Sequence, residues 1–445
     1  MIYDFLYEKA RPFHGRGVSD ESMTMTFGEL FEYAEKFGRK LRKQPEKKLG
    51  ILCRSELNTA TAILSCFFAG KTAVPLSVRY GYRHTKKIID SIGLGKIITD
   101  DGITAVSDTV SMSDDELGDV ALIMCTSGTT GSPKGAMLTH NNLIANLNDI
   151  SEYFHVSSGQ RILISRPLYH CAVLTGEFLL SLIKGLDIVF DSKDFNPVRI
   201  AHRLDEGNIS VMCGTPTIFY HICSLAGEKI HGKLSTIAVS GECMTENTAG
   251  VMRSVFPDAD IYNVYGLTEA SPRVSYLPPE LFDEYPLSVG FPLSSVSAKI
   301  NDGELLIKGA SVMKGYYGNP EATARVKRSG WLHTGDIAEI TDKGLIFIKT
   351  RKDNLIIRAG MNIYPQEIEN ALKSDPRIVE VLAYGEKRMT AGQKVCLKVV
   401  TNGLAKSEVF SICKKLLPAY QLPDRIDIVE DIPRNASGKI IRRVT

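Results

Sequence analysis

Several features that would indicate an exported or membrane-bound protein are missing from this sequence. The nine cysteines are odd in number and scattered without a C-x-x-C pair, which argues against a disulfide framework and against a zinc site. The first residues, MIYDFLYEKARPFHG, mix charged and apolar side chains and do not resemble a signal peptide. No apolar run has the length of a membrane span. We therefore expect a cytoplasmic protein without membrane insertion.

A strong excess of charge of one sign is also missing. The 445 residues carry a formal net charge of +2, which is too balanced to indicate binding of nucleic acid. There are no internal repeats and no low-complexity segments. The composition, with 44% hydrophobic and 23% charged residues, is that of a globular protein. The length indicates two or three domains.

In the first half of the chain, apolar runs alternate with segments of helical periodicity. The predicted strands are KLGILC, TAVPL and KIITD, and the predicted helices between them are NTATAILSCFFAG, which stops at Gly70, and HTKKIIDSIGLG. Such alternation indicates right-handed crossovers and a largely parallel sheet, so the fold class is α/β. From about residue 285, shorter strands and glycine turns predict a small β-rich subdomain. The charged stretch TRKDN then leads into a compact α/β tail.

Residues 125–135, CTSGTTGSPKG, combine hydroxyl side chains, glycines and one lysine. Glycines let backbone N–H groups turn toward one point, and the hydroxyls and the lysine add donors, which suits phosphate oxygens. The segment follows the predicted central strand DVALIMC and leads into the predicted helix LTHNNLIANLNDISEYF, with Thr139 as N-cap. It is not a Walker A motif, because glycine follows Lys134. A flexible surface loop is the alternative interpretation.

Four further segments carry residues that suit nucleotide chemistry. In NVYGLTEASP, Tyr265 can stack on a base and Glu269 can hold Mg²⁺, although the pattern is also typical of a turn at a strand end. In GWLHTGDIA, Asp336 follows a glycine turn and can accept two ribose hydroxyls. TRKDNLIIRAGMNIYPQEIE runs from a basic turn through a strand into a helix. PRNASGKIIRR places Lys439 on a turn, where a solvated tail charge is the alternative.

In this order and spacing, the five segments resemble the motif set of the ANL superfamily of adenylate-forming enzymes. That superfamily includes acyl- and aryl-CoA synthetases, adenylation domains of peptide synthetases, and luciferases. The resemblance covers nearly the whole chain. It implies a large N-terminal region of stacked α/β sheets with the β-rich subdomain, residues 1–351, and a small mobile α+β C-terminal domain, residues 352–445. Because the sequence ends just after the lysine motif, we expect a free-standing enzyme.

The resemblance also implies which residues bind ATP. The phosphate loop would comprise Thr126, Ser127, Gly128, Thr129, Thr130, Gly131 and Lys134. Adenine would lie between the strand edge at Gly241 and Glu242 and the ring of Tyr265. Asp336 and Arg351 would hold the ribose.

Further roles implied by the resemblance concern catalysis and the thiol acceptor. Thr268 would contact the α-phosphate, Glu269 would hold Mg²⁺, and Lys439 would be the catalytic lysine. Asp353 would be the hinge between the domains. Gly360 would line the tunnel of the thiol acceptor.

The segment RPLYHCAVLTGEFLLSLIKG, residues 166–185, would line the pocket of the acid together with Gly241 and Gly266. It lacks the aspartate that pairs with an α-ammonium group in peptide-synthetase domains, and its PLYH resembles the CoA ligases. His170 would lie at the pocket wall, with a histidine packed in the pocket floor as the alternative. Glu177 is expected on the outer face of the helix, and an acid with an amino group is the minor interpretation that it keeps open.

We therefore predict an ATP- and Mg²⁺-dependent acid–thiol ligase that forms an acyl-adenylate, releases pyrophosphate and passes the acyl group to CoA. The alternative is a stand-alone enzyme that loads a carboxylic or amino acid onto the phosphopantetheine of an acyl or peptidyl carrier protein. A non-catalytic acyl- or nucleotide-binding relative is disfavoured, because Glu269, Asp336 and Lys439 occur together. We expect a monomer or a homodimer.

Overall fold

The computed structural model describes residues 1–79, 81–106, 114–126, 133–191, 193–225, 234–358, 361–387 and 393–434. Contacts divide the chain into two compact units. The first unit comprises Met1–Met244, Val251–Ala298 and Ile307–His333, and the second comprises Thr245–Gly250, Lys299–Leu306 and the described residues from Thr334 onwards. The domain boundary predicted between residues 351 and 352 stays a prediction.

A seven-stranded sheet contains the strands that were predicted in the first part of the chain. Its strands, in spatial order, are β18 (Gly315–Tyr316), β8 (Lys134–Thr139), β7 (Val120–Thr126), β4 (Thr72–Pro75), β3 (Lys48–Ile51), β5 (Lys96–Thr99) and β6 (Gly102–Ala105). The neighbours β7, β4, β3 and β5 are parallel, whereas β8, β18 and β6 pair antiparallel at the two edges. The predicted parallel arrangement is confirmed for the centre of this sheet.

A nine-stranded sheet forms the second layer of strands in the first unit. Its strands, in spatial order, are β15 (Phe291–Pro292), β14 (Arg273–Leu277), β13 (Asp260–Gly266), β12 (Thr236–Ser240), β11 (Val211–Gly214), β9 (Arg161–Ile164), β10 (Asp187–Phe190), β1 (Gly17–Ser19) and β2 (Thr24–Thr26). The six strands from β13 to β1 are parallel, and β14, β15 and β2 pair antiparallel. The carboxyl ends of six strands therefore lie along one edge.

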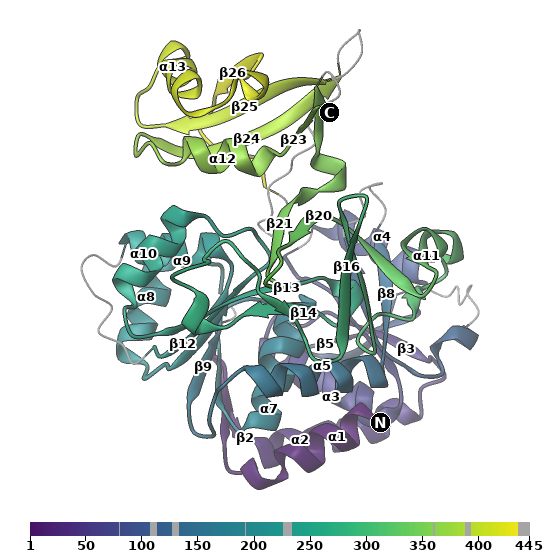
Figure 1. Cartoon of the computed structure of the whole chain (residues 1–445). Helices are drawn as coiled ribbons and strands as arrows, with labels where there is room; N and C mark the ends of the chain where they lie inside the picture. Colours follow the sequence, from purple (N-terminus) through teal and green to yellow (C-terminus); the bar gives the residue numbers. More distant parts are fainter. Residues whose placement is uncertain are drawn as a thin grey trace. The chain divides into compact units, whose positions relative to one another are not determined.

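Helices connect these strands. They are α1 (Ile2–Ala10), α2 (Phe27–Arg42), α3 (Glu56–Ala69), α4 (Tyr82–Ile92), α5 (His140–Tyr153), α6 (Cys171–Val173), α7 (Leu180–Lys184), α8 (Pro197–Glu206), α9 (Pro216–Leu225), α10 (Glu246–Val255) and α11 (Pro320–Val326). Figure 1 shows α1, α2 and α3 together near the N-terminus, where α3 contacts both α1 and α2. The expected alternation of helices and strands, and with it the α/β class, is confirmed.

Local signals set the ends of two predicted helices. The hydroxyl of Ser55 accepts a hydrogen bond from the amide of Asn58 at 3.0 Å and caps the start of α3. Gly70, with a φ of +67°, ends that helix in the left-handed conformation that glycine adopts without steric cost. Thr139 caps α5, because its hydroxyl accepts a hydrogen bond from the amide of Asn142 at 3.1 Å. The predicted stop and the predicted N-cap are both confirmed.

The structure corrects the prediction that the phosphate-loop segment leads directly into a helix. Residues 134–139 form strand β8, antiparallel to β7, and α5 begins only at His140. Both faces of β8 are buried, so its residues do not alternate between apolar and polar. Gly135 is needed for this packing, because a Cβ there would lie 2.6 Å from Cγ2 of Ile123 and 2.7 Å from Cδ1 of Ile92.

Shorter strands form a separate sheet, as predicted for the β-rich subdomain. Its strands, in spatial order, are β16 (Val296–Asn301), β17 (Glu304–Gly309), β20 (Trp331–Ile340) and β19 (Lys327–Arg328), with β21 (Ile346–Arg351) also paired to β20. β20 and β21 are antiparallel and joined by a tight turn. This hairpin belongs to the second unit from Thr334 onwards.

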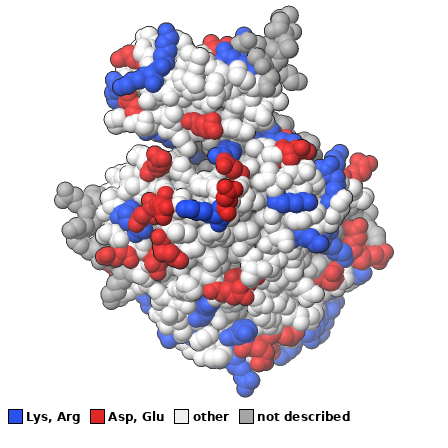
Figure 2. Space-filling model, in the orientation of Figure 1, with Lys and Arg blue, Asp and Glu red and all other residues white. Residues whose placement is uncertain are grey.

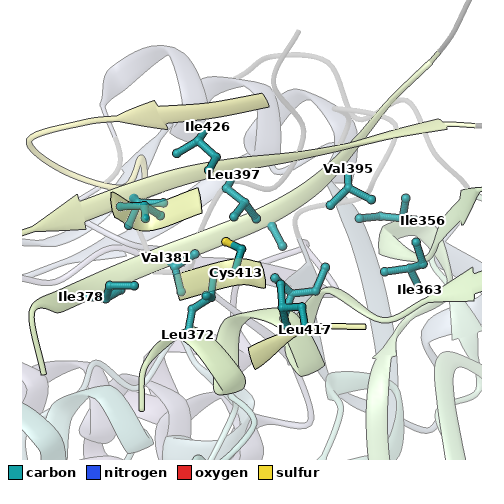
Figure 3. Packing of buried hydrophobic residues seen from close by; sticks show 14 of the residues in the cluster. Ile356, Ile363, Leu372, Ile378, Val381, Val395, Leu397, Cys413, Leu417 and Ile426 are labelled. Atoms are coloured by element: carbon teal, nitrogen blue, oxygen red, sulfur yellow. The ribbon is translucent and has the colours of Figure 1, made fainter. Parts of the chain in front are cut away.

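The last part of the chain is an α+β arrangement, as expected. The elements are β22 (Ile356–Arg358), β23 (Met361–Ile363), α12 (Pro365–Leu372), β24 (Ile378–Lys387), β25 (Gln393–Thr401), α13 (Lys406–Leu416) and β26 (Arg425–Ile428). Strand β25 lies between β24 and β26, and α12 packs on β24. Buried apolar side chains fill the space between the strands and helices (Figure 3); among them are Ile356, Ile363, Leu372, Val381, Leu397 and Cys413. This part therefore has a hydrophobic core of its own.

The surface carries charges of both signs, and the cysteines form no disulfide bonds. Lysine and arginine side chains are intermingled with aspartate and glutamate over the face of the first unit in Figure 2. All nine cysteines are free, and seven of them are buried. Within the described ranges, no helix combines the length and the hydropathy that are needed to span a bilayer.

We expect the cap of α5 to contribute measurably to stability. Replacing Thr139 by alanine removes the acceptor for the amide of Asn142 and should cost about 1 kcal/mol, whereas Thr139→Ser keeps the hydroxyl and should cost much less. Hydrogen exchange measured by mass spectrometry should show faster exchange in the first turn of α5 in Thr139→Ala alone. Equal protection of that turn in both variants would contradict the capping role.

Candidate active site

The carboxyl ends of β9, β11, β12 and β13 lie side by side along one edge of the nine-stranded sheet. Polar residues follow each of these strands: Arg166 comes shortly after β9, Thr215 after β11, and Gly241 and Glu242 after β12. Tyr265 lies at the end of β13 itself. In open α/β sheets, ligands bind outside the carboxyl ends of the parallel strands. The segments predicted to bind adenine and the acid therefore meet at the edge where a ligand site is expected.

The turn after β12 is fixed by its backbone and by one side chain. Gly241 has a φ of +92°, a conformation that L-residues with a Cβ rarely adopt. The carboxylate of Glu242 accepts a hydrogen bond from the hydroxyl of Thr217 at 2.6 Å and from its amide at 3.3 Å. These bonds hold the turn against the start of α9, the helix that follows the neighbouring strand β11.

The side chain of Tyr316 connects Lys134 of the phosphate-loop segment with Glu269. Nζ of Lys134 lies 5.3 Å from the centroid of the Tyr316 ring, and the hydroxyl of Tyr316 donates a hydrogen bond to Oε1 of Glu269 at 2.7 Å. The backbone supports the arrangement, because β18 pairs with β8 and the amide of Met313 donates to the carbonyl oxygen of Glu269 at 2.8 Å. Two residues predicted from separate motifs thus face one tyrosine.

Only the two ends of the predicted phosphate loop are described. The hydroxyl of Thr126, at the end of β7, lies 3.4 Å from the carbonyl oxygen of Lys134, at the start of β8. The remaining predicted residues lie outside the described part of the chain; they are Ser127, Gly128, Thr129, Thr130 and Gly131.

A tight turn carries Thr268 and Glu269 and returns the chain into β14. A short 3₁₀ helix, η4 (Thr268–Ala270), follows β13, and β14 then pairs antiparallel with β13. A Cβ on Gly266 would lie 2.2 Å from the carbonyl oxygen of Pro272, so the two segments can approach this closely only at a glycine. Arg273 is the partner of Gly266 in the strand register.

In the second unit, the structure brings together the two residues predicted to hold the ribose. Asp336 and Arg351 face each other across β20 and β21, and Nη1 of Arg351 lies 3.0 Å from Oδ1 of Asp336. The guanidinium also donates to the carbonyl oxygen of Thr334 at 3.1 Å. The carboxylate of Glu304 accepts from the amide of Gly335 at 2.9 Å, which fixes the turn before Asp336.

Three other predicted residues are placed less completely. Asp353 is exposed in a short 3₁₀ helix, η6 (Lys352–Asn354), directly after β21. Gly360 and Lys439 lie outside the described residues. The roles of all three as hinge, tunnel residue and catalytic lysine stay predictions.

The segment predicted to line the acid pocket begins with a fixed backbone. The amide of Leu168 donates a hydrogen bond to Oε2 of Glu56, at the start of α3, at 2.9 Å. His170 is the N-cap residue of α6, is partly exposed, and its ring centroid lies 4.2 Å from that of Tyr169. His170 is therefore not fully buried, and its place at the wall of an acid pocket stays a prediction.

The structure contradicts the expectation that Glu177 lies on an outer face. Its side chain is 0% exposed, and Oε1 lies 2.6 Å from Nη2 of Arg166. The expectation rested on the cost of burying a carboxylate without a partner, and in the structure Arg166 is that partner. Glu177 lies in a π-helical turn, η3 (Leu174–Leu179). Burial raises the pKa of the Glu177 carboxyl, and Arg166 offsets part of that rise.

Two family models match the chain in separate stretches. The model described as "AMP-binding enzyme" matches residues 103–317, and the one described as "AMP-binding enzyme C-terminal domain" matches residues 367–439. Together the two models match well over half of the sequence. The chain belongs to the AMP-binding enzymes.

Curated relatives and solved structures place this AMP-binding enzyme among acid–thiol ligases. It is 28% identical to a feruloyl-CoA synthase of an Amycolatopsis species over 96% of this chain and 95% of that protein. It is 27% identical to 2-succinylbenzoate–CoA ligase of Bacillus velezensis over 95% and 93%. It is also similar to the o-succinylbenzoate CoA synthetase of Bacillus subtilis solved with the acyl-adenylate intermediate OSB-AMP, with 25% identity, a TM-score of 0.87 and coverage of 98% and 96%.

Sequence reasoning missed three residues at this site of the AMP-binding enzyme. Tyr316, Arg166 and Arg273 each contact or neighbour a predicted residue, but none belongs to the matched pattern of a motif. The sequence does contain a signal for the two arginines. Arg166 is the charged residue that begins RPLYH, and Arg273 is the charged residue that directly follows TEASP. Tyr316 gave no such signal, because its contact with Glu269 depends on strand pairing.

We expect Glu56 to make the stability of the first unit depend on pH. Burial raises the pKa of its carboxyl from 4.5 to about 7; the charge of Arg79 lowers it and those of Asp20 and Glu21 raise it. Because the folded protein then binds the extra proton, this contribution is fully present below pH 4.5 and is lost as the pH rises toward 7. The loss is roughly 3 kcal/mol, since a pKa shift of one unit corresponds to about 1.4 kcal/mol.

Thermal unfolding midpoints of Glu56→Gln and of wild type, measured from pH 4.5 to 7.5, test this expectation. The variant should lose less stability across that range than wild type, while Glu32→Gln, at an exposed position of α2, should follow wild type. Parallel profiles for wild type and Glu56→Gln would show that Glu56 titrates near its ordinary pKa.

Proposed function

We propose that this AMP-binding enzyme activates a carboxylic acid with ATP and transfers the acyl group to the thiol of coenzyme A. The observation that carries the proposal is the position of Gly241, Glu242, Tyr265 and Glu269 at one edge of the nine-stranded sheet, where the segment of His170 also begins. The relatives named as CoA ligases support the same reaction, as does the synthetase solved with an acyl-adenylate.

In this proposal, the nucleotide lies along the carboxyl ends of the strands. Adenine packs between the backbone at Gly241 and the ring of Tyr265. Glu269 supplies a carboxylate oxygen, the kind of ligand with which Mg²⁺ is bound beside substrate phosphates. Its carboxylate fits that role, because it is partly exposed and held in place by the hydroxyl of Tyr316. When bound, Mg²⁺ would neutralise phosphate charge, and the B. subtilis synthetase has also been solved with ATP and a magnesium ion.

The reaction sets the charges that the site must supply. A carboxylate oxygen of the acid bonds to the α-phosphorus of ATP, and the bond from that phosphorus to the departing pyrophosphate oxygen breaks. Both reactants are anions, so cations must lie where charge develops. We assign this role to Lys134 and Lys439, and the contact with the α-phosphate to Thr268. The thiol then attacks the acyl carbon, AMP leaves, and the thiol proton is released.

Other assignments complete the proposal. Asp336 and Arg351 bind the ribose hydroxyls, Asp353 acts as the hinge, and Gly360 lines the path of the thiol. The acceptor is coenzyme A because the matched relatives are named CoA synthases and ligases. A carrier protein with a phosphopantetheine thiol is the alternative, since it presents the same reacting group.

Exchange of labelled pyrophosphate into ATP, measured across classes of acid, tests the proposed activity. We expect exchange with acyl or aryl acids that lack an α-amino group and little with common α-amino acids. The single carboxylate of segment 166–185, Glu177, is already paired with Arg166, and burying an unpaired ammonium would cost several kcal/mol. Strong exchange with an amino acid that is lost in Glu177→Gln would reverse this conclusion. Incubation with CoA or with a carrier protein then identifies the acceptor.

Lys439→Ala should abolish adenylation, because the developing charge on the α-phosphate loses a cation; we expect a decrease of about 100-fold or more in pyrophosphate exchange. Transfer from a supplied acyl-adenylate to CoA should stay within a few-fold of wild type, because that step breaks the bond from the acyl carbon to oxygen and neither forms nor breaks a bond to the α-phosphorus.

Arg442→Ala is the matched control, since it removes a neighbouring positive charge of the same tail. It should leave both half-reactions close to wild type. If both half-reactions decrease equally in a folded Lys439→Ala protein, the lysine has no specific role in adenylation.

A further inference from the structure

A buried cluster of three charged side chains lies beside the proposed acid pocket. Arg166 follows β9, Glu177 lies in the π-helical turn η3, and Arg273 begins β14. The side chain of Glu177 is 0% exposed, that of Arg166 is 13% exposed, and Arg273 as a residue is 2% exposed. Charged groups are rarely buried to this degree unless they are paired or bind a ligand.

The cluster contains one more positive than negative charge. Oε1 of Glu177 lies 2.6 Å from Nη2 of Arg166, so the charge of Arg166 has a direct counter-ion. No salt bridge of Arg273 is found among the described residues, and in that part of the chain its Nε has no hydrogen-bond partner. Glu177 acts on Arg273 only through its charge. The guanidinium of Arg273 is therefore a buried cation with unused donors.

The backbone holds Arg273 in one position. The side-chain amide of Asn146, on α5, donates to the carbonyl oxygen of Arg273 at 2.9 Å and accepts from its amide at 3.2 Å. On the opposite side, the guanidinium lies against Gly176, where a Cβ would come within 3.0 Å of Nε and 3.1 Å of Nη2. The glycine thus leaves the space that the guanidinium occupies, and the site is preorganised.

This position belongs to the site that we assign to the acid. Arg273 faces Gly266 in the register of β13 and β14, only a few residues after Glu269. The charges of Glu269 and Arg273 both act on the thiol of Cys171, whose pKa is raised to about 12 by burial. Cys171 directly follows His170, so the wall of the proposed pocket lies within electrostatic reach of both residues. The two residues act on Cys171 with opposite signs, because Glu269 is a carboxylate and Arg273 is a guanidinium.

We propose that the acid activated by this enzyme carries a second anionic group, as a dicarboxylic acid does, and that the guanidinium of Arg273 binds it. The inference rests on the proposed function. One carboxylate reacts with the α-phosphate of ATP, and the other accepts hydrogen bonds from Arg273, whose planar guanidinium matches the geometry of a carboxylate. The only carboxylate of segment 166–185, that of Glu177, is in direct contact with Arg166, whereas Arg273 has no such ion pair among the described residues.

A comparison of matched acids with the wild-type enzyme tests this inference without any substitution. Pyrophosphate exchange is measured with pairs that differ in one terminal group: butyrate and succinate, hexanoate and adipate, benzoate and terephthalate. We expect kcat/KM to be higher for the dicarboxylate in at least one pair by about 10- to 100-fold, the effect of one charge-assisted hydrogen bond. Higher kcat/KM for the monocarboxylate in every pair would overturn the inference and leave the proposed function intact.

Arg273→Met then assigns the effect to the residue, with Arg11→Met, at an exposed arginine of the same unit, as the matched control. Arg273→Met should remove the preference by raising KM for the dicarboxylate, Arg273→Lys should restore part of it, and Arg11→Met should keep it. Arg273→Gln, which keeps hydrogen-bond donors but no charge, replaces Arg273→Met if that variant does not fold. A preference that survives in folded Arg273→Met would overturn the assignment, and absence of exchange with every acid would overturn the proposed function and this inference together.

Discussion

The hydrogen-bond ladder of six parallel strands is the constraint on which the first unit depends. Because β13, β12, β11, β9, β10 and β1 run in the same direction, the segments that follow them must leave the sheet along one edge. Buried apolar residues on these strands hold the ladder in register. The direction of the strands therefore determines the edge of the sheet at which the polar residues lie. The row formed by Arg166, Thr215, Gly241 and Tyr265 is a consequence of strand direction rather than of any contact among these side chains.

Contacts between distant segments then orient individual groups along this edge. Tyr316 connects Lys134 with Glu269, although the three residues come from three separate stretches of the chain. The pairing of β18 with β8 places the tyrosine, and the buried strand β8 in turn requires Gly135. In the second unit, the register of β20 and β21 does the same for Asp336 and Arg351. A small number of strand pairings thus determines most of the candidate site.

The buried charges of Arg166, Glu177 and Arg273, beside the proposed acid pocket, carry an energetic cost that the fold offsets only in part. The pair Arg166–Glu177 is well placed to offset its own desolvation, since the two groups are in direct contact. Arg273 lacks such a partner among the described residues and is held by Asn146 and Gly176 instead. Destabilised buried groups of this kind are common at ligand sites, where the ligand supplies the missing interaction. In the proposed function, the buried guanidinium of Arg273 lowers the stability of the free protein and provides selectivity for the acid.

The sequence by itself determined the elements that depend on neighbouring residues. Strands β3, β4, β5 and β7, the stop of α3 at Gly70 and the cap of α5 at Thr139 follow from periodicity and local hydrogen bonding. The order and spacing of the five motifs indicated the family, because both can be read along the chain without knowledge of the fold. Asp336 and Arg351 could be paired in advance for the same reason.

Only the tertiary structure decided which side chains are buried and which distant residues meet. Strand β8 escaped prediction because a strand that is buried on both faces shows no alternation. The burial of Glu177 escaped prediction because its partner, Arg166, comes into contact with it only in the folded chain. The positions of Tyr316 and Arg273 depend on antiparallel pairings between β18 and β8 and between β14 and β13, and such pairings are set by the packing of whole sheets rather than by local sequence.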